Sequence, residues 1–177
     1  MLILSLLKVK DLTNLFMDIA YPFVPKSNAR LRPGHFWPIK LSNSKYACGI
    51  VLDVPKEKGL YTTRMFYAGL LDWIGDSKPT ANSLESSPLT ILRQGHAHIK
   101  TILFCNEAIE GYIDPVKNNL EIELVVDALY YSTATKVLKG FEVVRKATMQ
   151  DHENLRNKSA WGYAVINNSA NHLLGEK

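Results

Sequence analysis

Hydrophobic positions change their spacing once along the N-terminal third of the chain. Over residues 12–19, apolar residues recur at i, i+3, i+4 and i+7, which gives one apolar stripe and predicts a short helix. Asp11 or Thr13 can cap its first turn, and Pro22 prevents it from continuing. A basic connector follows and ends at the Pro33-Gly34 turn signal.

From Phe36 onward the period becomes two, which is typical of a strand. Residues 36–41 alternate so that Phe36 faces away from Trp37 and Ile39. A polar turn at residues 42–45 leads into a longer apolar run, so the stretch predicts a β-hairpin. Pro38 has no N–H to donate, which places the first strand at an edge or makes it enter the sheet there.

Later apolar runs, separated by Gly, Pro and Asn, predict further strands, although 120–131 has the composition of a helix as well. The segments around the last strand are expected to be short helices or polar turns. The predicted strands are 64–74, 89–92, 97–105, 120–131, 137–147 and 161–166, and the short helices are 151–158 and 168–174. We therefore expect a β-rich α+β fold, with a curved or barrel-like, mainly antiparallel sheet and a few short helices. Residues 26–177 would form one domain on which residues 1–25 pack.

The composition is that of a globular protein: 46% of the 177 residues are hydrophobic and 21% are charged. Cys48 and Cys105 each lie in an apolar run, which favours two free thiols over a disulfide. The first apolar run stops at Leu7 with no basic residue before it, so it does not fit a signal peptide. No run approaches the roughly 20 apolar residues of a membrane span, and we expect a soluble, cytoplasmic protein.

Charge is distributed unevenly around the net value of +4. No acidic residue occurs between Asp18 and Asp53, whereas acids accumulate from Glu107 to Asp127 against a single basic residue, Lys117. Such an arrangement can steer a charged partner, or it can reflect two ordinary solvated faces. The basic segment contains Lys26, Arg30, Arg32, Lys40 and Lys45, and the acidic segment contains Glu107, Glu110, Asp114, Glu121, Glu123 and Asp127.

Candidate catalytic chemistry is sparse. His96 and His98 would share one face of a strand, as two metal ligands do, but the next acid and the next histidine, Glu107 and His152, are poorly spaced to complete a site. Glu107 and Glu110 could act as paired carboxylates, although i, i+3 spacing is more typical of a solvated turn. The chain has neither a nucleophile-elbow motif nor a phosphate-binding glycine loop. We expect no enzymatic activity, no cofactor and no metal.

Aromatic residues interleave with the basic residues of the N-terminal third. Small β-barrels bind single-stranded nucleic acid with such sets, in which rings stack on bases and cations follow the phosphates. A small, basic nucleic-acid-binding β-barrel is therefore one hypothesis for the function. The aromatic residues concerned are Tyr21, Phe23, Phe36, Trp37 and Tyr46.

Three short motifs carry a family resemblance: PGHFWPI at 33–39, KYACGIV at 45–51 and WGY at 161–163. Together they resemble the Immunity protein 26 family, with Gly95 as a further match in a middle strand. The chain departs from that family at His35, where an acid is usual, and at Ile39, where leucine is usual. The resemblance implies a non-enzymatic immunity protein that binds and neutralises a cognate toxin of a bacterial polymorphic-toxin system.

Neutralisation by occlusion requires aromatic anchors and a charge complementary to the target rather than a reactive group. Trp73 and Trp161 are expected in the core, whereas Trp37 is a candidate anchor because Pro38 indicates an edge strand. Either charged segment could supply the rest of the interface. The candidate contact residues are Arg30, Arg32, Trp37 and Lys40 on the basic side, and Glu107, Glu110, Glu121 and Glu123 on the acidic side.

Overall fold

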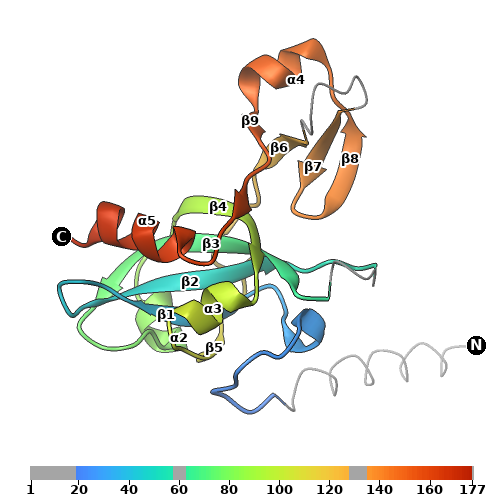
Figure 1. Ribbon diagram of the computed structural model, residues 1–177. Helices are drawn as coiled ribbons and strands as arrows, with labels where there is room; N and C mark the ends of the chain where they lie inside the picture. Colours follow the sequence, from blue (N-terminus) through green and yellow to red (C-terminus); the bar gives the residue numbers. More distant parts are fainter. Residues whose placement is uncertain (1–18, 58–62, 128–134, 177) are drawn as a thin grey trace, which may run out of the picture.

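The computed structural model describes residues 19–57, 63–127 and 135–176, and it contains two β-sheets joined end to end (Figure 1). The helix predicted at 12–19 lies outside the described residues except for its last position. The larger sheet has the strand order β10-β4-β3-β2-β1-β5. Its strands are β1 (His35–Lys40), β2 (Tyr46–Asp53), β3 (Met65–Gly75), β4 (Ile91–His98), β5 (Gly111–Tyr112) and β10 (Ala160–Trp161).

The predicted hairpin is confirmed as β1 and β2, which pair antiparallel from Phe36 opposite Ile50 to Lys40 opposite Tyr46. The period of two places alternate side chains in two separate cores: Trp37 belongs to one and Phe36 to the other. β5 pairs with β1 only at the first two residues of β1, His35 and Phe36. Pro38 thus lies where β2 is the only neighbouring strand of the described sheet, which accommodates its missing N–H.

Helices cover both faces of this sheet (Figure 1). α5 (Val165–Leu174) and α3 (Lys100–Phe104) cover one face, where Ile166, Leu174 and Ile102 are buried in the same core as Trp37. The short α2 (Ala81–Glu85) covers the other face through Leu84. A sheet that is buried on both faces provides a rigid support for the loops and helices around it.

The smaller sheet has the order β8-β7-β6-β9 and projects from the β4 end of the larger one (Figure 1). Hydrogen bonds join the two: the Phe141 N–H donates to the Asp53 carboxylate at 3.0 Å, and the Glu123 N–H donates to the Gln94 side chain at 3.0 Å. The elements here are β6 (Leu124–Asp127), β7 (Lys136–Lys139), β8 (Glu142–Lys146), α4 (Met149–Asn154) and β9 (Arg156–Asn157).

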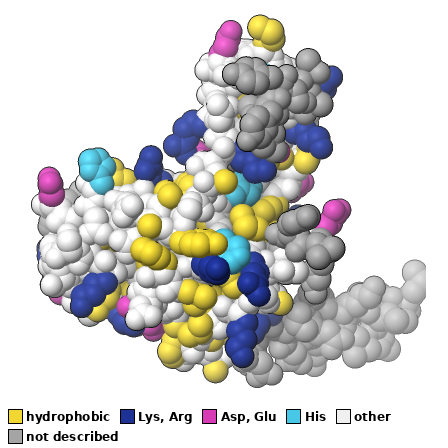
Figure 2. All heavy atoms as spheres, in the orientation of Figure 1, with side chains coloured by type: hydrophobic (Ala, Val, Ile, Leu, Met, Phe, Trp, Pro, Cys, Tyr) yellow, Lys and Arg dark blue, Asp and Glu magenta, His cyan; other side chains and the backbone are white. Residues whose placement is uncertain are grey.

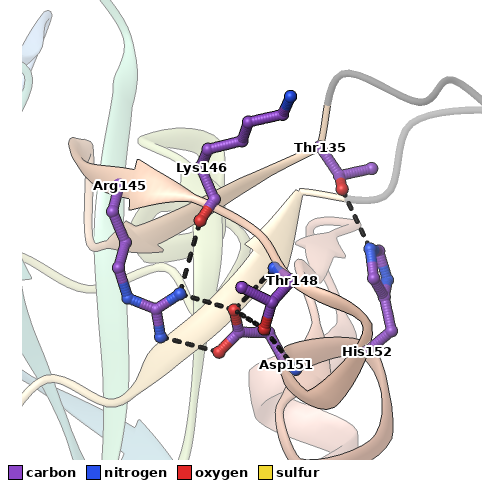
Figure 3. A network of polar contacts seen from close by, with 6 residues as sticks. All are labelled: Thr135, Arg145, Lys146, Thr148, Asp151 and His152. Carbon is purple, nitrogen blue, oxygen red and sulfur yellow. Dashed lines mark hydrogen bonds and ion pairs between the residues drawn. The ribbon is translucent and has the colours of Figure 1, made fainter.

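A polar network closes the smaller sheet against α4 (Figure 3). The Thr148 hydroxyl and the Asp151 carboxylate form a reciprocal capping box at the start of the helix. Arg145 of β8 donates to both oxygens of that carboxylate, at 2.5 and 2.6 Å. His152 Nε2 lies 2.9 Å from the Thr135 hydroxyl. These bonds pin α4 to the sheet that precedes it.

The β-rich α+β class is confirmed, but the described strands do not close into a barrel, and both sheets are mixed because β10 runs parallel to β4 and β9 parallel to β6. The thiols of Cys48 and Cys105 are free, as expected. No helix within the described residues has the length and apolar character that a bilayer span requires.

Several predicted elements are wrong in part. The strand predicted at 89–92 is the start of β4, the described strand within 120–131 begins only at Leu124, and the helix predicted at 151–158 gives way to β9 after Asn154. Three further predicted strands run past a change of element. The strand predicted at 97–105 ends at His98 and gives way to α3, where Ile99 and Ile102 point into the core at helical spacing. The strand at 137–147 is a hairpin, because Gly140 turns the chain at φ 61°. The strand at 161–166 ends at Trp161, and α5 begins at Val165. Short apolar runs fit a buried helix as well as a strand.

Candidate partner-binding surface

The predicted acidic interface is largely neutralised within the chain. Lys78 pairs with Glu107 at 2.5 Å and with Glu110 at 3.1 Å. Glu123 forms an ion pair with Arg156 of β9. Carboxylates already held by an internal cation have less to gain from a basic partner, because that bond must first be broken.

Among the four predicted acidic contacts, Glu121 alone forms no ion pair with a described residue. It lines an open groove of about 580 Å³ between β5 and β7, together with Tyr112, Lys139 and the exposed Val116. Asp114 lines the same groove, also without an ion pair to a described residue, but its carboxylate accepts the Val116 N–H at 2.9 Å. Two carboxylates beside Lys139 do not make a strongly acidic face. The structure therefore offers little support for a basic target on this side.

Trp37 is a core residue, and the expectation that it anchors a partner is wrong. Its side chain is 0% exposed, and its indole meets the ring of Phe66 edge-on at a centroid distance of 5.6 Å. The edge position of Pro38 did not expose it, because α5 and the segment before β5 cover this face of β1. Aromatic side chains other than Trp37 lie beside the predicted contact residues Arg30 and Arg32.

Arg30 and Arg32 lie beside a cluster of aromatic rings that surrounds His35. The Arg30 guanidinium stands 4.4 Å from the centroid of the Phe23 ring, in cation–π geometry. The rings of Tyr21 and Phe23 lie 5.6 and 5.4 Å from the His35 imidazole. Tyr112 approaches the same imidazole from β5 at 6.3 Å. Segments more than 70 residues apart thus meet around one buried histidine.

His35 is held as a neutral imidazole. Its Nδ1 accepts the Arg32 backbone N–H at 3.2 Å, so its Nε2–H donates to the Tyr21 hydroxyl at 2.9 Å. Burial is the main cause that lowers the pKa of His35 to about 4, and the charges of Arg32 and Arg30 add to it. Tyr21 is 38% exposed, and its own O–H remains available to donate to an acceptor on a partner.

The basic character continues from Arg30 toward α3. The Asn28 N–H donates to the Thr63 carbonyl at 2.8 Å, which places the 3₁₀ turn η1 (Asn28–Arg30) beside Arg64. The Ile99 N–H donates in turn to the Arg64 carbonyl at 2.8 Å, which brings the start of α3 against the same segment. Backbone hydrogen bonds therefore fix the order of these cations along the surface.

At the far end of this stripe, Lys100 stands 5.2 Å from the centroid of the Tyr163 ring, and His98 lies 5.6 Å from the same ring. Burial and the charges of Lys100 and Arg64 all lower the pKa of His98, which confirms that these groups are neighbours. Tyr163 is 45% exposed and Phe104 of α3 is 56% exposed. Apolar groups and cations thus share one surface.

We name this stripe the basic–aromatic surface. Figure 2 shows Lys and Arg side chains gathered over α3 beside a histidine and a group of hydrophobic side chains. Arg30, Arg64 and Lys100 form no ion pair with any residue in the described ranges. The basic–aromatic surface consists of Tyr21, Arg30, Arg32, Arg64, Lys100, Phe104 and Tyr163.

Lys40, the last predicted basic contact, lies at the end of β1 and borders this surface. It lines a shallow groove of about 610 Å³ together with Phe104, Cys105 and Asn167. The charge distribution of the sequence predicts Arg30, Arg32 and Lys40 as contact residues. It does not predict Arg64, Lys100 or Tyr163, because these are single residues in separate segments that only the tertiary fold brings together.

His96 and His98, the two candidate metal ligands, contact different groups. His96 is buried between the rings of Tyr67 and Phe141, and its Nε2 lies 2.9 Å from the Gly140 carbonyl. His98 lies instead against Tyr163. Within the described ranges, no three histidine, cysteine or acidic side chains are arranged to hold a metal ion.

Comparison with known proteins gives no relative: no family model, no curated protein and no solved structure matches this chain. The resemblance to the Immunity protein 26 family stays a prediction. Two of its motif residues nevertheless have a structural role, because Gly49 and Gly95 each lie directly beneath a tryptophan, Trp37 and Trp161 respectively.

Proposed function

We propose that this protein is a non-enzymatic immunity protein that neutralises a toxin by covering it with the basic–aromatic surface. The observation that supports the proposal is the charge left after internal pairing. Lys78 and Arg156 neutralise three of the four predicted acidic contacts. Arg30, Arg64 and Lys100, by contrast, form no ion pair with a described residue, and exposed aromatic rings lie on the same surface. In this proposal the protein acts in the cytoplasm of the cell that makes the toxin.

The residue types fit such an interface. Tyr and Arg are enriched among the residues that dominate binding energy, and their side chains combine large contact area with directional hydrogen bonds. The connecting segments and the helix α3 that carry this surface pack against a sheet buried on both faces, so little conformational freedom is lost when a partner docks. Tyr21 is further held by its bond to His35, and its hydroxyl can still donate a hydrogen bond to an acceptor on the partner.

The proposed target is an acidic face of the toxin. Carboxylates there would receive bidentate hydrogen bonds from Arg30 and Arg64. Tyr163 and Phe104 would be covered by apolar side chains at the centre of the contact. Complementary charge of this kind speeds association and excludes basic partners, so a toxin with only a basic surface would not bind.

The test uses the toxin domain encoded beside the gene for this chain. The purified domain is titrated with the wild-type protein and with the charge-reversal variant R64E/K100E by calorimetry. Losing two interfacial cations should weaken binding at least about 30-fold, with on-rates that respond strongly to salt. The control K117E/K146E changes the net charge equally at two exposed lysines, one in the segment after β5 and one on β8 of the smaller sheet, and should bind like wild type.

Nucleic acid is the second candidate, because unpaired cations beside exposed rings also suit a single strand. The ring of Tyr163 is already approached by Lys100 and His98, and that of Tyr21 by Phe23 and His35, which leaves less open ring face for base stacking. An oligonucleotide bound by the wild type, released steeply by salt and lost in R64E/K100E would favour this candidate over a toxin.

A further inference from the structure

A small cavity of about 230 Å³ lies where the two sheets meet. β3 and β4 form one wall, and the chain around β6, β9 and β10 forms the other. The walls are fixed in place: the Gln94 side chain accepts the Glu123 N–H at 3.0 Å and donates to the Glu121 carbonyl at 3.3 Å. β10 completes the enclosure by pairing with β4.

Tyr67 of β3 lines this cavity and is only 1% exposed. Its ring packs edge-on against His96, yet its hydroxyl forms no hydrogen bond with any residue that the structure describes. Burial raises the pKa of Tyr67, Glu123 raises it further and Arg156 lowers it, so both charges lie within electrostatic reach of that hydroxyl. Since Tyr67 lines the cavity, a guest there could accept a hydrogen bond from this hydroxyl.

The other polar groups of the cavity are mainly donors. Arg93 gives one nitrogen to the Ser169 hydroxyl at 2.8 Å and forms no ion pair with a described residue. Arg156 shares its charge with Glu123, so these three charged side chains sum to +1. Trp161 adds an indole at the rim. A net positive, donor-rich space favours a guest that is anionic and rich in acceptors.

We propose that this cavity is a binding site for a small oxyanion, the phosphate or carboxylate group of a compact metabolite. Tyr67 and Arg93 are the residues that hold it, through the phenolic O–H and the guanidinium fork. The volume lies below the 300–1,000 Å³ that is usual for drug-sized ligands, so the guest is compact. The proposal does not depend on the toxin-binding function.

The experiment titrates the full chain with inorganic phosphate and, separately, with acetate at constant ionic strength and near pH 7. Tryptophan fluorescence and thermal unfolding are followed together. Saturable changes are expected with at least one anion, and the anion that binds more tightly identifies the group. Tyr67→Phe should weaken the apparent affinity about tenfold, as expected for one hydrogen bond to a charged acceptor.

Two controls separate binding from folding. Tyr112→Phe removes an exposed hydroxyl elsewhere and should leave the titration unchanged. Trp161→Phe should remove most of the fluorescence change while the thermal shift remains. The proposal is overturned if neither anion gives a saturable change, or if Tyr67→Phe binds as tightly as the wild type.

Discussion

Trp37 lies directly opposite Gly49 in the β1–β2 ladder, and its indole covers the glycine backbone. A Cβ at residue 49 would meet the six-membered ring of the indole closer than real Cβ contacts occur. Trp37 thereby fills the space over Gly49 and is sealed into the core. The pair explains why an aromatic residue on a partly open strand is unavailable to a partner.

Gly49→Ala is expected to destabilise the protein by about 1–3 kcal/mol, because the added methyl group must displace a fully buried indole. Denaturant unfolding of both proteins measures the difference. Gly162→Ala is the matched control, since a Cβ there would meet only Val165, at 3.9 Å. It should change stability by less than about 0.5 kcal/mol. Equal effects of the two substitutions would contradict the proposed role of the pair.

The local pattern predicted the hairpin and the two faces of β1, because a period of two is written directly in residues 36–41. The burial of Trp37 was not predictable in the same way. It depends on α5, more than 120 residues further along, which packs on the same core. The neutral state of the acidic segment depends likewise on Lys78 and Arg156, whose pairing with Glu107 and Glu123 no spacing rule indicates.

Residues 97–105 show why an apolar run can be misread. Two of its residues, Ile99 and Ile102, point inward with the spacing of a helix, yet the preceding Ala97 continues a strand. The strand gives way to the helix where its pairing with β3 ends, at Met65 opposite His98. The neighbouring strand thus determines where β4 ends, and this end cannot be predicted from the sequence of β4 alone.

His35 is expected to make stability depend on pH. Its pKa falls to about 4 in the folded protein against an ordinary value of 6.5. Below about pH 6.5 the unfolded chain therefore binds a proton that the folded chain does not. The contribution of His35 to the free energy of unfolding should be constant above pH 6.5. It should fall, by up to about 3 kcal/mol, as the pH drops toward 4.

Denaturant titrations between about pH 7 and pH 4 measure this loss, and His35→Asn should reduce it, since the amide oxygen can still accept the Arg32 N–H. A residual slope is expected from His96, whose pKa burial also lowers. An unchanged slope in His35→Asn would show that His35 does not carry the effect.

Asp151→Asn tests the network in Figure 3. The Arg145 guanidinium and the Thr148 N–H hold the pKa of the Asp151 carboxyl well below its usual range. Its stabilising effect is thus complete above the ordinary carboxyl pKa and is lost only as the pH falls through and below it. The substitution should lower the melting temperature near pH 7 by several degrees. Thr148→Ser, which keeps the capping hydroxyl, should lower it far less.

The most direct test of the central claim is the affinity for the adjacent toxin domain, measured by calorimetry for the wild type, R64E/K100E and K117E/K146E. We expect a stable complex that survives size exclusion, weakened at least about 30-fold in R64E/K100E and unchanged in K117E/K146E. The absence of a complex with wild-type protein, or equal affinities of all three proteins, would contradict the claim that the basic–aromatic surface neutralises a toxin.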